Sequence, residues 1–285
     1  MSIRPMKELI MDASKEDRAV GAFNVGNMEM LIGAVKAAEE LNTPIILQIA
    51  QIRLKHSPLD LMGPMMIHAA RNAKVDVAVH LDHGLTVDTV QQALDLGFTS
   101  VMFDGSKYEL PENIKVTGQV IRMAEERGAS TEAELGVVGG SEDNSLNHKM
   151  VCTDPDVARD FVKETGVDAL AVAIGNAHGH YTTEPKIRFD ILEEIHQKVA
   201  VPLVLHGGTG ISPQDFRTCI QHGIRKINIA TANFDALTRG AEKYFRTEAP
   251  YNYFALNEAM VREVYGNVKK HIEIFNNRIP LEQIS

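Results

Sequence analysis

Three histidines of this 285-residue chain stand where apolar runs end, and together they could build a metal site. His83 closes the run 77–84, Val-Ala-Val-His-Leu-Asp-His-Gly, while His178 and His206 close two later runs, and each of the three precedes a glycine. Three neutral imidazoles from three strands suit Zn²⁺ and leave a fourth position for water or a substrate. A single such histidine is usually a hydrogen-bonded core residue, but the shared placement predicts that the three bind zinc together.

Residues beside these histidines could carry protons or support the metal ligands. Asp82 adjoins His83, so its carboxylate could exchange a proton with a metal-bound substrate, or could merely orient a histidine. His80 shares a strand face with Asp82 and is expected to support the ligands from behind. His180 lies two residues beyond His178, further into a loop, and ranks second to it as a ligand.

Acidic residues near the ends of two other apolar runs are further candidates. Asp104 and Glu134 could orient a metal ligand or form a second metal position, although a structural carboxylate would explain Glu134 equally well. The glycine-rich segment 136–144 follows. Its Glu142 could enter the site when this segment closes, and a plain surface loop is the alternative.

Two glycine-containing segments, 206–212 and 228–231, lead from the seventh and eighth apolar runs into amphipathic stretches. Glycines expose backbone N–H groups, and helix N-termini attract anions, so these segments predict a phosphate site. The candidate residues are Gly207, Gly208, Thr209, Asn228, Ile229, Ala230 and Thr231.

The elements that must position these residues are short apolar runs alternating with amphipathic segments. The expected strands are 20–24, 44–50, 75–81, 100–103, 130–135, 169–174, 202–206 and 226–230, and expected helices include 28–41, 112–127, 155–165, 189–199 and 212–222. Eight such units without a linker predict an α/β fold, a single (β/α)₈ TIM barrel domain over 1–285, with a doubly wound sheet as the alternative. The segment 252–276 is expected to add one or two helices, in a C-terminal extension of about 250–285.

The composition limits the partners and the compartment. A net charge of −9 argues against a nucleic-acid partner. No window approaches 18 uninterrupted apolar residues and no signal peptide precedes the first strand, so we expect no membrane partner. Two distant cysteines, Cys152 and Cys219, fit a reduced, cytoplasmic protein without disulfides.

Several motifs together make the chain recognisable. They are Ala-Phe-Asn at 22–24, His-Leu-Asp-His at 80–83, Asp-Gly-Ser at 104–106, Glu-Ala-Glu-Leu-Gly at 132–136, Gly-Gly-Ser-Glu at 139–142, Ala-Ile-Gly-Asn-Ala-His-Gly at 173–179, Leu-His-Gly at 205–207 and Asn-Ile-Ala-Thr at 228–231. Over essentially residues 1–235 the chain resembles the class II, zinc-dependent ketose-bisphosphate aldolases, and most closely the tagatose-bisphosphate aldolase branch.

The resemblance implies a reaction and a role for each motif. The reaction is reversible retro-aldol cleavage of a ketose (bis)phosphate, such as tagatose or fructose 1,6-bisphosphate, to dihydroxyacetone phosphate and an aldehyde. By resemblance, His83, His178 and His206 hold Zn²⁺, Asp82 gives a proton to the aldehyde-derived oxygen, and Glu142 removes the proton from the ketone. It further implies a phosphate bound by Gly179 and the segments 207–209 and 228–231, a monovalent cation (Na⁺ or K⁺) nearby, and a homo-oligomer, dimer or tetramer.

Zinc chemistry would make a Schiff-base lysine unnecessary, because the metal stabilises the enediolate as a Lewis acid. In agreement, we expect no lysine in an apolar setting at the interior strand ends, with Lys226 preceding the eighth strand. The same expectation counts against a metal-dependent barrel hydrolase, the more distant alternative. Intact Asp82 and histidines count against a third alternative, a non-catalytic partner of another aldolase.

Two departures from the family concern the far end of the substrate. Phe254 stands where relatives that grip a second phosphate carry arginine, and the second strand continues into Gln-Ile-Ala-Gln-Ile-Arg, ending at Arg53. Either Arg53 contacts the distal phosphate, or the substrate is a ketose 1-phosphate that lacks one. The sugar epimer stays open, because tagatose and fructose differ at one hydroxyl.

Overall fold

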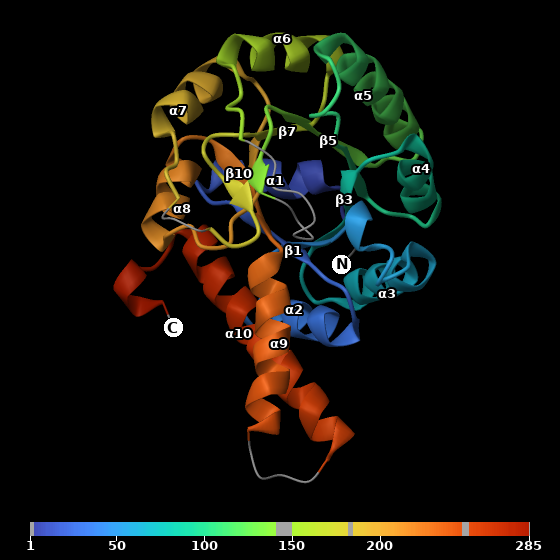
Figure 1. Cartoon of the computed structure of the whole chain (residues 1–285), viewed down its shortest axis with the longest axis vertical. Coiled ribbons are helices and arrows are strands. Elements are labelled where there is room, and N and C mark those ends of the chain that lie inside the picture. The colour runs from blue at the N-terminus through green and yellow to red at the C-terminus, as the bar shows by residue number, and fades with distance from the viewer. Residues whose placement is uncertain (1–2, 141–149, 182–184, 247–250, 285) are drawn as a thin grey trace.

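The computed structural model describes residues 3–140, 150–181, 185–246 and 251–284. Parallel strands form a closed barrel, and helices surround it (Figure 1). The order around the barrel is β1-β10-β9-β7-β5-β4-β3-β2. The predicted (β/α)₈ barrel is therefore confirmed.

The barrel strands are buried on both faces, which explains their continuous apolar character. They are β1 (Val20–Asn24), β2 (Ile45–Ala50), β3 (Val77–Gly84), β4 (Ser100–Phe103), β5 (Ser130–Leu135), β7 (Ala169–Val172), β9 (Leu203–Leu205) and β10 (Ile224–Ile229). Two short strands, β6 (Gly139–Gly140) and β8 (Ala177–His178), pair in parallel outside the barrel.

Helices follow the strands, and several of them begin at residues whose side chains cap them. They are α2 (Met28–Glu40), α3 (Leu59–Asn72), α4 (Val87–Asp95), α5 (Leu110–Glu125), α6 (Pro155–Thr165), α7 (Phe189–Lys198), α8 (Pro213–Gln221), α9 (Thr231–Phe245) and α10 (Tyr253–Asn276), with short 3₁₀ turns η1 (Gln51–Arg53) and η2 (Leu281–Gln283). Thr86, Asp154 and Ser212 accept hydrogen bonds from backbone N–H groups in the first turns of α4, α6 and α8. These polar groups satisfy donors that a helix start leaves unpaired.

The first helix, α1 (Met6–Lys15), closes the amino end of the barrel and lies outside the helix ranges expected from the sequence. Its buried side chains are Met6, Leu9, Ile10 and Ala13, at the i, i+3, i+4 and i+7 positions of one helix face. They form a core cluster with small and branched side chains of the barrel interior: Val20, Ala22, Ile46, Ala78, Ala169, Ala171 and Val204. Figure 1 shows α1 behind the ring of strands. Chemistry is thereby left to the other end of the barrel.

The last two long helices, α9 and α10, form a hairpin that projects from the barrel (Figure 1). Glycines permit its close packing, since a Cβ added at Gly33 of α2 would lie 2.9 Å from Val264, and one at Gly240 would lie 2.6 Å from the backbone of Met260. The far part of this hairpin exposes Phe254, which is 76% accessible. This helical segment agrees with the predicted C-terminal helices.

Truncating a buried side chain of α1, which closes the amino end of the barrel, should destabilise the protein. Ile10 is fully buried, so Ile10→Ala should lower the free energy of unfolding by about 2–5 kcal/mol in urea titrations. Met11, the next residue, is 47% exposed, so Met11→Ala should change it by less than about 0.5 kcal/mol. Equal losses in the two variants would contradict the assignment of α1 as a core element.

Candidate metal centre and active site

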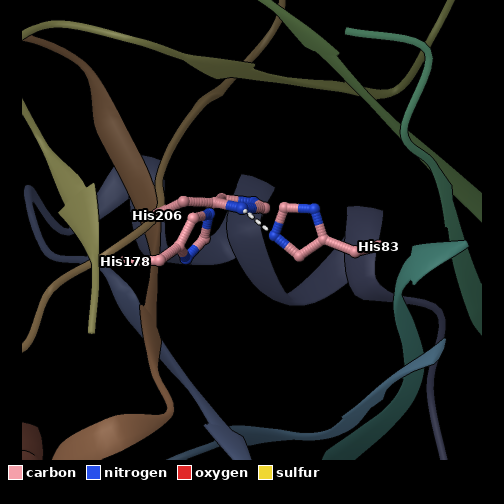
Figure 2. A group of neighbouring side chains, drawn as sticks. All are labelled: His83, His178 and His206. Carbon is pink, nitrogen blue, oxygen red and sulfur yellow. Dashed lines mark hydrogen bonds between the residues drawn. The ribbon is translucent and has the colours of Figure 1, made fainter. Parts of the chain in front are cut away.

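The structure brings His83, His178 and His206 together at the carboxyl end of the barrel (Figure 2). Their ligand nitrogens all lie within 4.8 Å of one another. Ring centroids are 4.6 Å apart for His83 and His206, and 4.9 Å apart for His83 and His178. Three elements supply them: β3, the short strand β8, and the segment that follows β9.

A local backbone distortion lets adjacent residues of β3 face the same site. In a regular strand Asp82 and His83 would point to opposite faces. Here the pairing of β3 with β4 shifts register between Leu81 and Gly84, and His83 adopts a left-handed φ of 41°. Such bulges and unusual φ values re-aim side chains at functional sites. His83 therefore joins Asp82 inside the barrel mouth.

The donor set of these histidines fits a bound cation. His206 Nε2 lies 2.7 Å from Glu132 Oε1, and His83 Nδ1 lies 2.8 Å from Asp104 Oδ2. Each carboxylate can only accept, so these ring nitrogens carry the protons. The remaining nitrogens, His206 Nδ1 and His83 Nε2, lie 2.8 Å apart, and in neutral rings each would offer a lone pair to a cation. Burial holds the pKa of His206 well below its ordinary value, which keeps this ring neutral.

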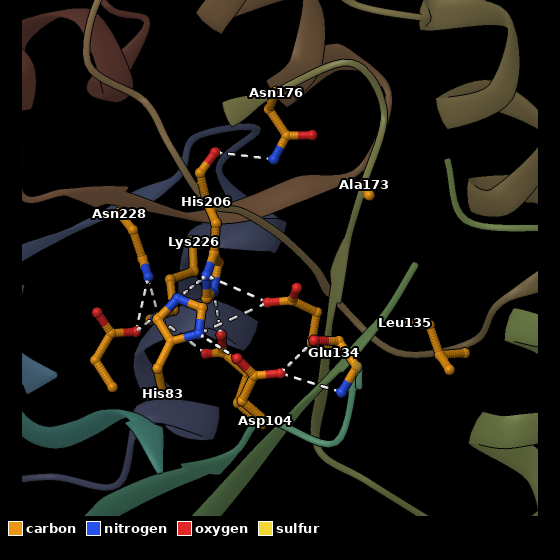
Figure 3. A network of polar contacts seen from close by, with 12 residues as sticks. His83, Asp104, Glu134, Leu135, Ala173, Asn176, His206, Lys226 and Asn228 are labelled. Carbon is orange, nitrogen blue, oxygen red and sulfur yellow. Dashed lines mark hydrogen bonds and ion pairs between the residues drawn. The ribbon is translucent and has the colours of Figure 1, made fainter. Parts of the chain in front are cut away.

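Two carboxylates behind His83 differ in ionisation. Burial opposes ionisation of Asp104, but hydrogen bonds from His83 and Ser106 hold its pKa well below the ordinary value. Glu134 has a pKa well above the ordinary value, because it is buried and lies near the charge of Asp104. Its Oε2 is 3.9 Å from His83 Nδ1 and 3.7 Å from His206 Nδ1 (Figure 3). Asp104 and Glu134, with His83, thus form a second group with metal-ligand spacing.

Asp82 lies fully buried beside the histidine cluster, and amide groups hold it. Asn24 Nδ2 and Gln48 Nε2 donate to its Oδ2, and Asn228 Nδ2 donates to its Oδ1, all at 3.1 Å. Burial acts to raise the pKa of Asp82, but the nearby side chains of His83, His206 and Lys226 together lower it. The side chain is therefore an oriented carboxylate, with Oδ1 4.0 Å from His83 Nε2.

The other two histidines considered as ligands lie outside the cluster of three. His80 is fully buried, with Nδ1 2.7 Å from Ser100 Oγ and Nε2 3.7 Å from Glu132 Oε2. It therefore lies against the carboxylate that contacts a clustered histidine. His180 is 66% exposed, and its Nε2 lies 3.3 Å from Asp235 Oδ2.

The expectation that Lys226 precedes the eighth strand is wrong, because this residue lies inside β10. Lys226 is fully buried in β10, and its Nζ lies 2.8 Å from Glu132 Oε2. It also donates to Asn228 Oδ1 at 2.7 Å. The strand begins at Ile224, so Lys226 and Asn228, two residues apart, share its inner face. The sequence offered one signal for this burial: Lys226 precedes the candidate site residue Asn228 by two positions, so both lie on the same face of a strand.

The phosphate-loop candidates line a common recess beside His178. The residues that surround it are His178, Gly179, Gly207, Gly208, Thr209, Asn228, Ala230 and Thr231. Ile229 differs from this set, since its side chain is fully buried in the core. The N-terminus of α9 lies here, and Thr209 Oγ1 accepts from the N–H of Ala232 at 3.0 Å.

Tyr181, which the sequence reasoning missed, ties this recess to β8. Its hydroxyl accepts from the N–H of Ala177 at 2.8 Å and donates to the carbonyl of Gly207 at 3.1 Å. Burial raises its pKa to about 12, so the hydroxyl stays protonated. Composition gave no signal for it, because a tyrosine in a loop is common.

Of the remaining candidates, the structure describes Arg53 and Phe254 but not Glu142. Arg53 lies in η1 beyond β2, with its guanidinium 4.8 Å from the ring centroid of Phe234. Its neighbour Ile52 lines a cavity that His83 and His178 also line. Phe254 is exposed on the projecting hairpin, and Glu142 lies outside the described residues.

Fold and site define a (β/α)₈-barrel protein with a histidine centre at the end where such barrels carry out catalysis. The family model of class-II fructose-bisphosphate aldolase matches residues 4–278. The chain is 36% identical over 278 residues to the fructose-bisphosphate aldolase of Staphylococcus epidermidis, covering 95% of this chain and 97% of the relative. Against that of Geobacillus stearothermophilus it is 40% identical over 248 residues, covering 85% and 86%.

A solved structure is also similar, the YdjI aldolase from Escherichia coli K12, with a TM-score of 0.86, 34% identity and coverage of 96% and 97%. This chain belongs to the class II fructose-bisphosphate aldolase family. It is thus an aldolase, a carbon–carbon lyase that acts on a sugar phosphate. No helix within the described ranges is long and apolar enough to span a membrane.

The recess should depend on the missing side chain of Gly207. This residue has a φ of +64°, and a Cβ there would lie 2.2 Å from the Ala177 carbonyl oxygen. Gly207→Ala should therefore shift the loop and raise KM for the sugar phosphate about tenfold, roughly 1.4 kcal/mol of binding. Gly166→Ala is the matched control, because Gly166 has a φ of +72° with nothing within 4 Å. If both variants raise KM alike in steady-state assays, the close approach at the recess is irrelevant.

Proposed function

We propose that this chain is a zinc-dependent aldolase that releases dihydroxyacetone phosphate from a ketose phosphate. The observation that carries the proposal is the convergence of His83, His178 and His206, whose ligand nitrogens all lie within 4.8 Å of one another. In neutral rings these nitrogens would each offer a lone pair to the ion. His83, His178 and His206 would hold Zn²⁺, which when bound supplies Lewis-acid stabilisation of the enediolate charge.

Asp82 is proposed to move the proton of the carbon–carbon cleavage. As an ionised carboxylate it accepts the hydroxyl proton of the substrate when the bond breaks, and it returns that proton to the aldehyde oxygen in condensation. Its amide contacts orient it without offering a competing acid. Glu142 is proposed to exchange the proton at the ketone carbon.

The substrate phosphate is assigned to the recess that Gly179 and the loops 207–209 and 228–231 form. Backbone N–H groups of glycine-rich loops and the N-terminus of α9 favour an anion there. A Na⁺ or K⁺ ion beside this recess, and a homo-oligomeric assembly, belong to the same proposal.

The far end of the substrate is proposed to lie toward Arg53. The turn η1 is fixed near the mouth, because Gln51 Oε1 accepts from the N–H groups of Leu85 and Thr86. Tagatose or fructose 1,6-bisphosphate then fits if the guanidinium meets the distal phosphate. A ketose 1-phosphate is the second candidate, favoured by Phe254 and its place on the projecting hairpin.

Zinc and proton transfer can be separated by variants of adjacent residues. His83→Ala should lose bound zinc and activity together, because it removes a ligand. Asp82→Ala should keep stoichiometric zinc and lose at least about a hundredfold in kcat, the usual size of a lost proton-transfer group. Metal content by atomic emission and cleavage assays before and after chelation check both. Full activity after complete zinc removal would contradict the proposal.

A substrate panel that varies distal phosphorylation and the C4 configuration tests the far end. If Arg53 binds a phosphate, Arg53→Met should raise KM for bisphosphates about tenfold or more and leave ketose 1-phosphates unchanged. Arg188→Met is the control, since Arg188 pairs with Asp190 at the start of α7. Preference of the parent chain for ketose monophosphates would exclude the hypothesis that Arg53 binds a distal phosphate.

A further inference from the structure

We propose that Lys226 is a positioning residue that holds both a metal ligand, His206, and the proton carrier, Asp82, through one buried ammonium. The inference rests on the proposed function for the roles of those two residues. Lys226 reaches both groups through intermediate residues. It acts through Glu132 on one side and Asn228 on the other.

The first connection runs to the metal ligand. Lys226 Nζ lies 2.8 Å from Glu132 Oε2, and Glu132 Oε1 lies 2.7 Å from His206 Nε2. The ammonium thereby occupies one carboxylate oxygen and leaves the other for the ring. That contact keeps the proton on His206 Nε2 and turns Nδ1 toward His83. Without the ammonium, Glu132 is free to rotate toward His80, whose Nε2 is 3.7 Å from the same Oε2.

The second connection runs to the proton carrier. An ammonium can only donate, so its 2.7 Å contact with Asn228 requires Oδ1 on that side of the amide. The amide Nδ2 must then point the other way, where it donates to Asp82 Oδ1 at 3.1 Å. Figure 3 labels Lys226 and Asn228 near His206 in this network. Lys226 therefore decides which amide atom meets the carboxylate.

A buried lysine needs such a reason. Removing an ammonium from water costs several kcal/mol, and an apolar side chain of similar size is often as stable or more so. Lys226 is fully buried in the barrel and could be replaced by methionine on packing grounds. Its value must then lie in the orientation of the groups around it.

The experiment compares Lys226→Met with the parent chain by two measurements. Zinc affinity of the metal-free protein, by competition with a chromogenic chelator, should fall about 10–100-fold, as for other partners behind metal ligands. With zinc saturating, kcat should fall at least about tenfold while KM changes less than about threefold, because Asp82 acts on the reacting oxygen. Values for both within threefold of the parent would overturn the inference.

A double variant separates the two connections and covers the case in which the single variant does not fold. Lys226→Met with Glu132→Gln leaves no unpaired charge, and the glutamine oxygen can still accept from His206 Nε2. Zinc affinity should return to within about threefold of the parent, while the loss in kcat persists because Asn228 has no donor to orient it. Recovery of kcat together with zinc would overturn the role toward Asp82.

Arg225 provides the matched control. It is the next residue of β10, it is 7% exposed, and its guanidinium donates to the backbone carbonyls of Ile220 and Ile224 rather than into the barrel. Arg225→Met should lower thermal stability without changing zinc affinity or kcat, and equal losses would show a general folding effect. A parent chain inactive on all sugar phosphates would refute the proposed function, yet its zinc affinity would still test Lys226.

Discussion

The structure depends on a single constraint: polar side chains inside the carboxyl half of the barrel have lost their water and must satisfy one another. An unpartnered buried charge is costly, so each group there fixes the orientation of the next. Glu132 links Lys226 to His206, and Asn228 links Lys226 to Asp82. Beside these groups, His83, His178 and His206 bring their ligand nitrogens within 4.8 Å of one another, a grouping that suits a cation.

The amino half of the barrel interior is apolar, in contrast to the polar carboxyl half, and this contrast makes the polar arrangement possible. There α1 fills the opening with apolar side chains, and the strands contribute residues such as Ala22, Ala78 and Ala171. Small interior residues leave room for the helix, so water is excluded from below and the barrel is rigid beneath the site. The polar side chains of the carboxyl half therefore lie above an apolar layer without water, where electrostatic interactions are strong. Ion pairs and oriented amides in that layer can hold their geometry without competing solvent.

Much of this could be predicted from the sequence, and the failures have identifiable causes. Strands buried on both faces are recognisable in the sequence as apolar runs, and polar residues at their ends indicate the mouth of the barrel. The fold and the grouping of His83 with His178 could therefore be predicted from local patterns. The burial of Lys226 did not, because its partner Glu132 is far away in the sequence and only the closed barrel joins them. The turn of His83 into the site needs a bulge that no residue type signals. Helix α1 was not among the expected helices, although its apolar spacing fits one helix face, and its position under the strands depends on tertiary packing.

The difference between barrel strands and outer elements also explains why the proposed site for the near end of the substrate is better defined than the site for its far end. The barrel interior and the recess proposed for the phosphate are built from strand ends and loop backbone, and the closed sheet fixes the positions of the strand ends. The far end depends on η1 and on the projecting hairpin, which lie outside the closed sheet. The Arg53 guanidinium lies 4.8 Å from the ring centroid of Phe234, so a helix outside the barrel helps to direct this side chain. Substrate preference can therefore change among relatives through these outer elements, while the chemistry of bond cleavage stays with the buried network beneath.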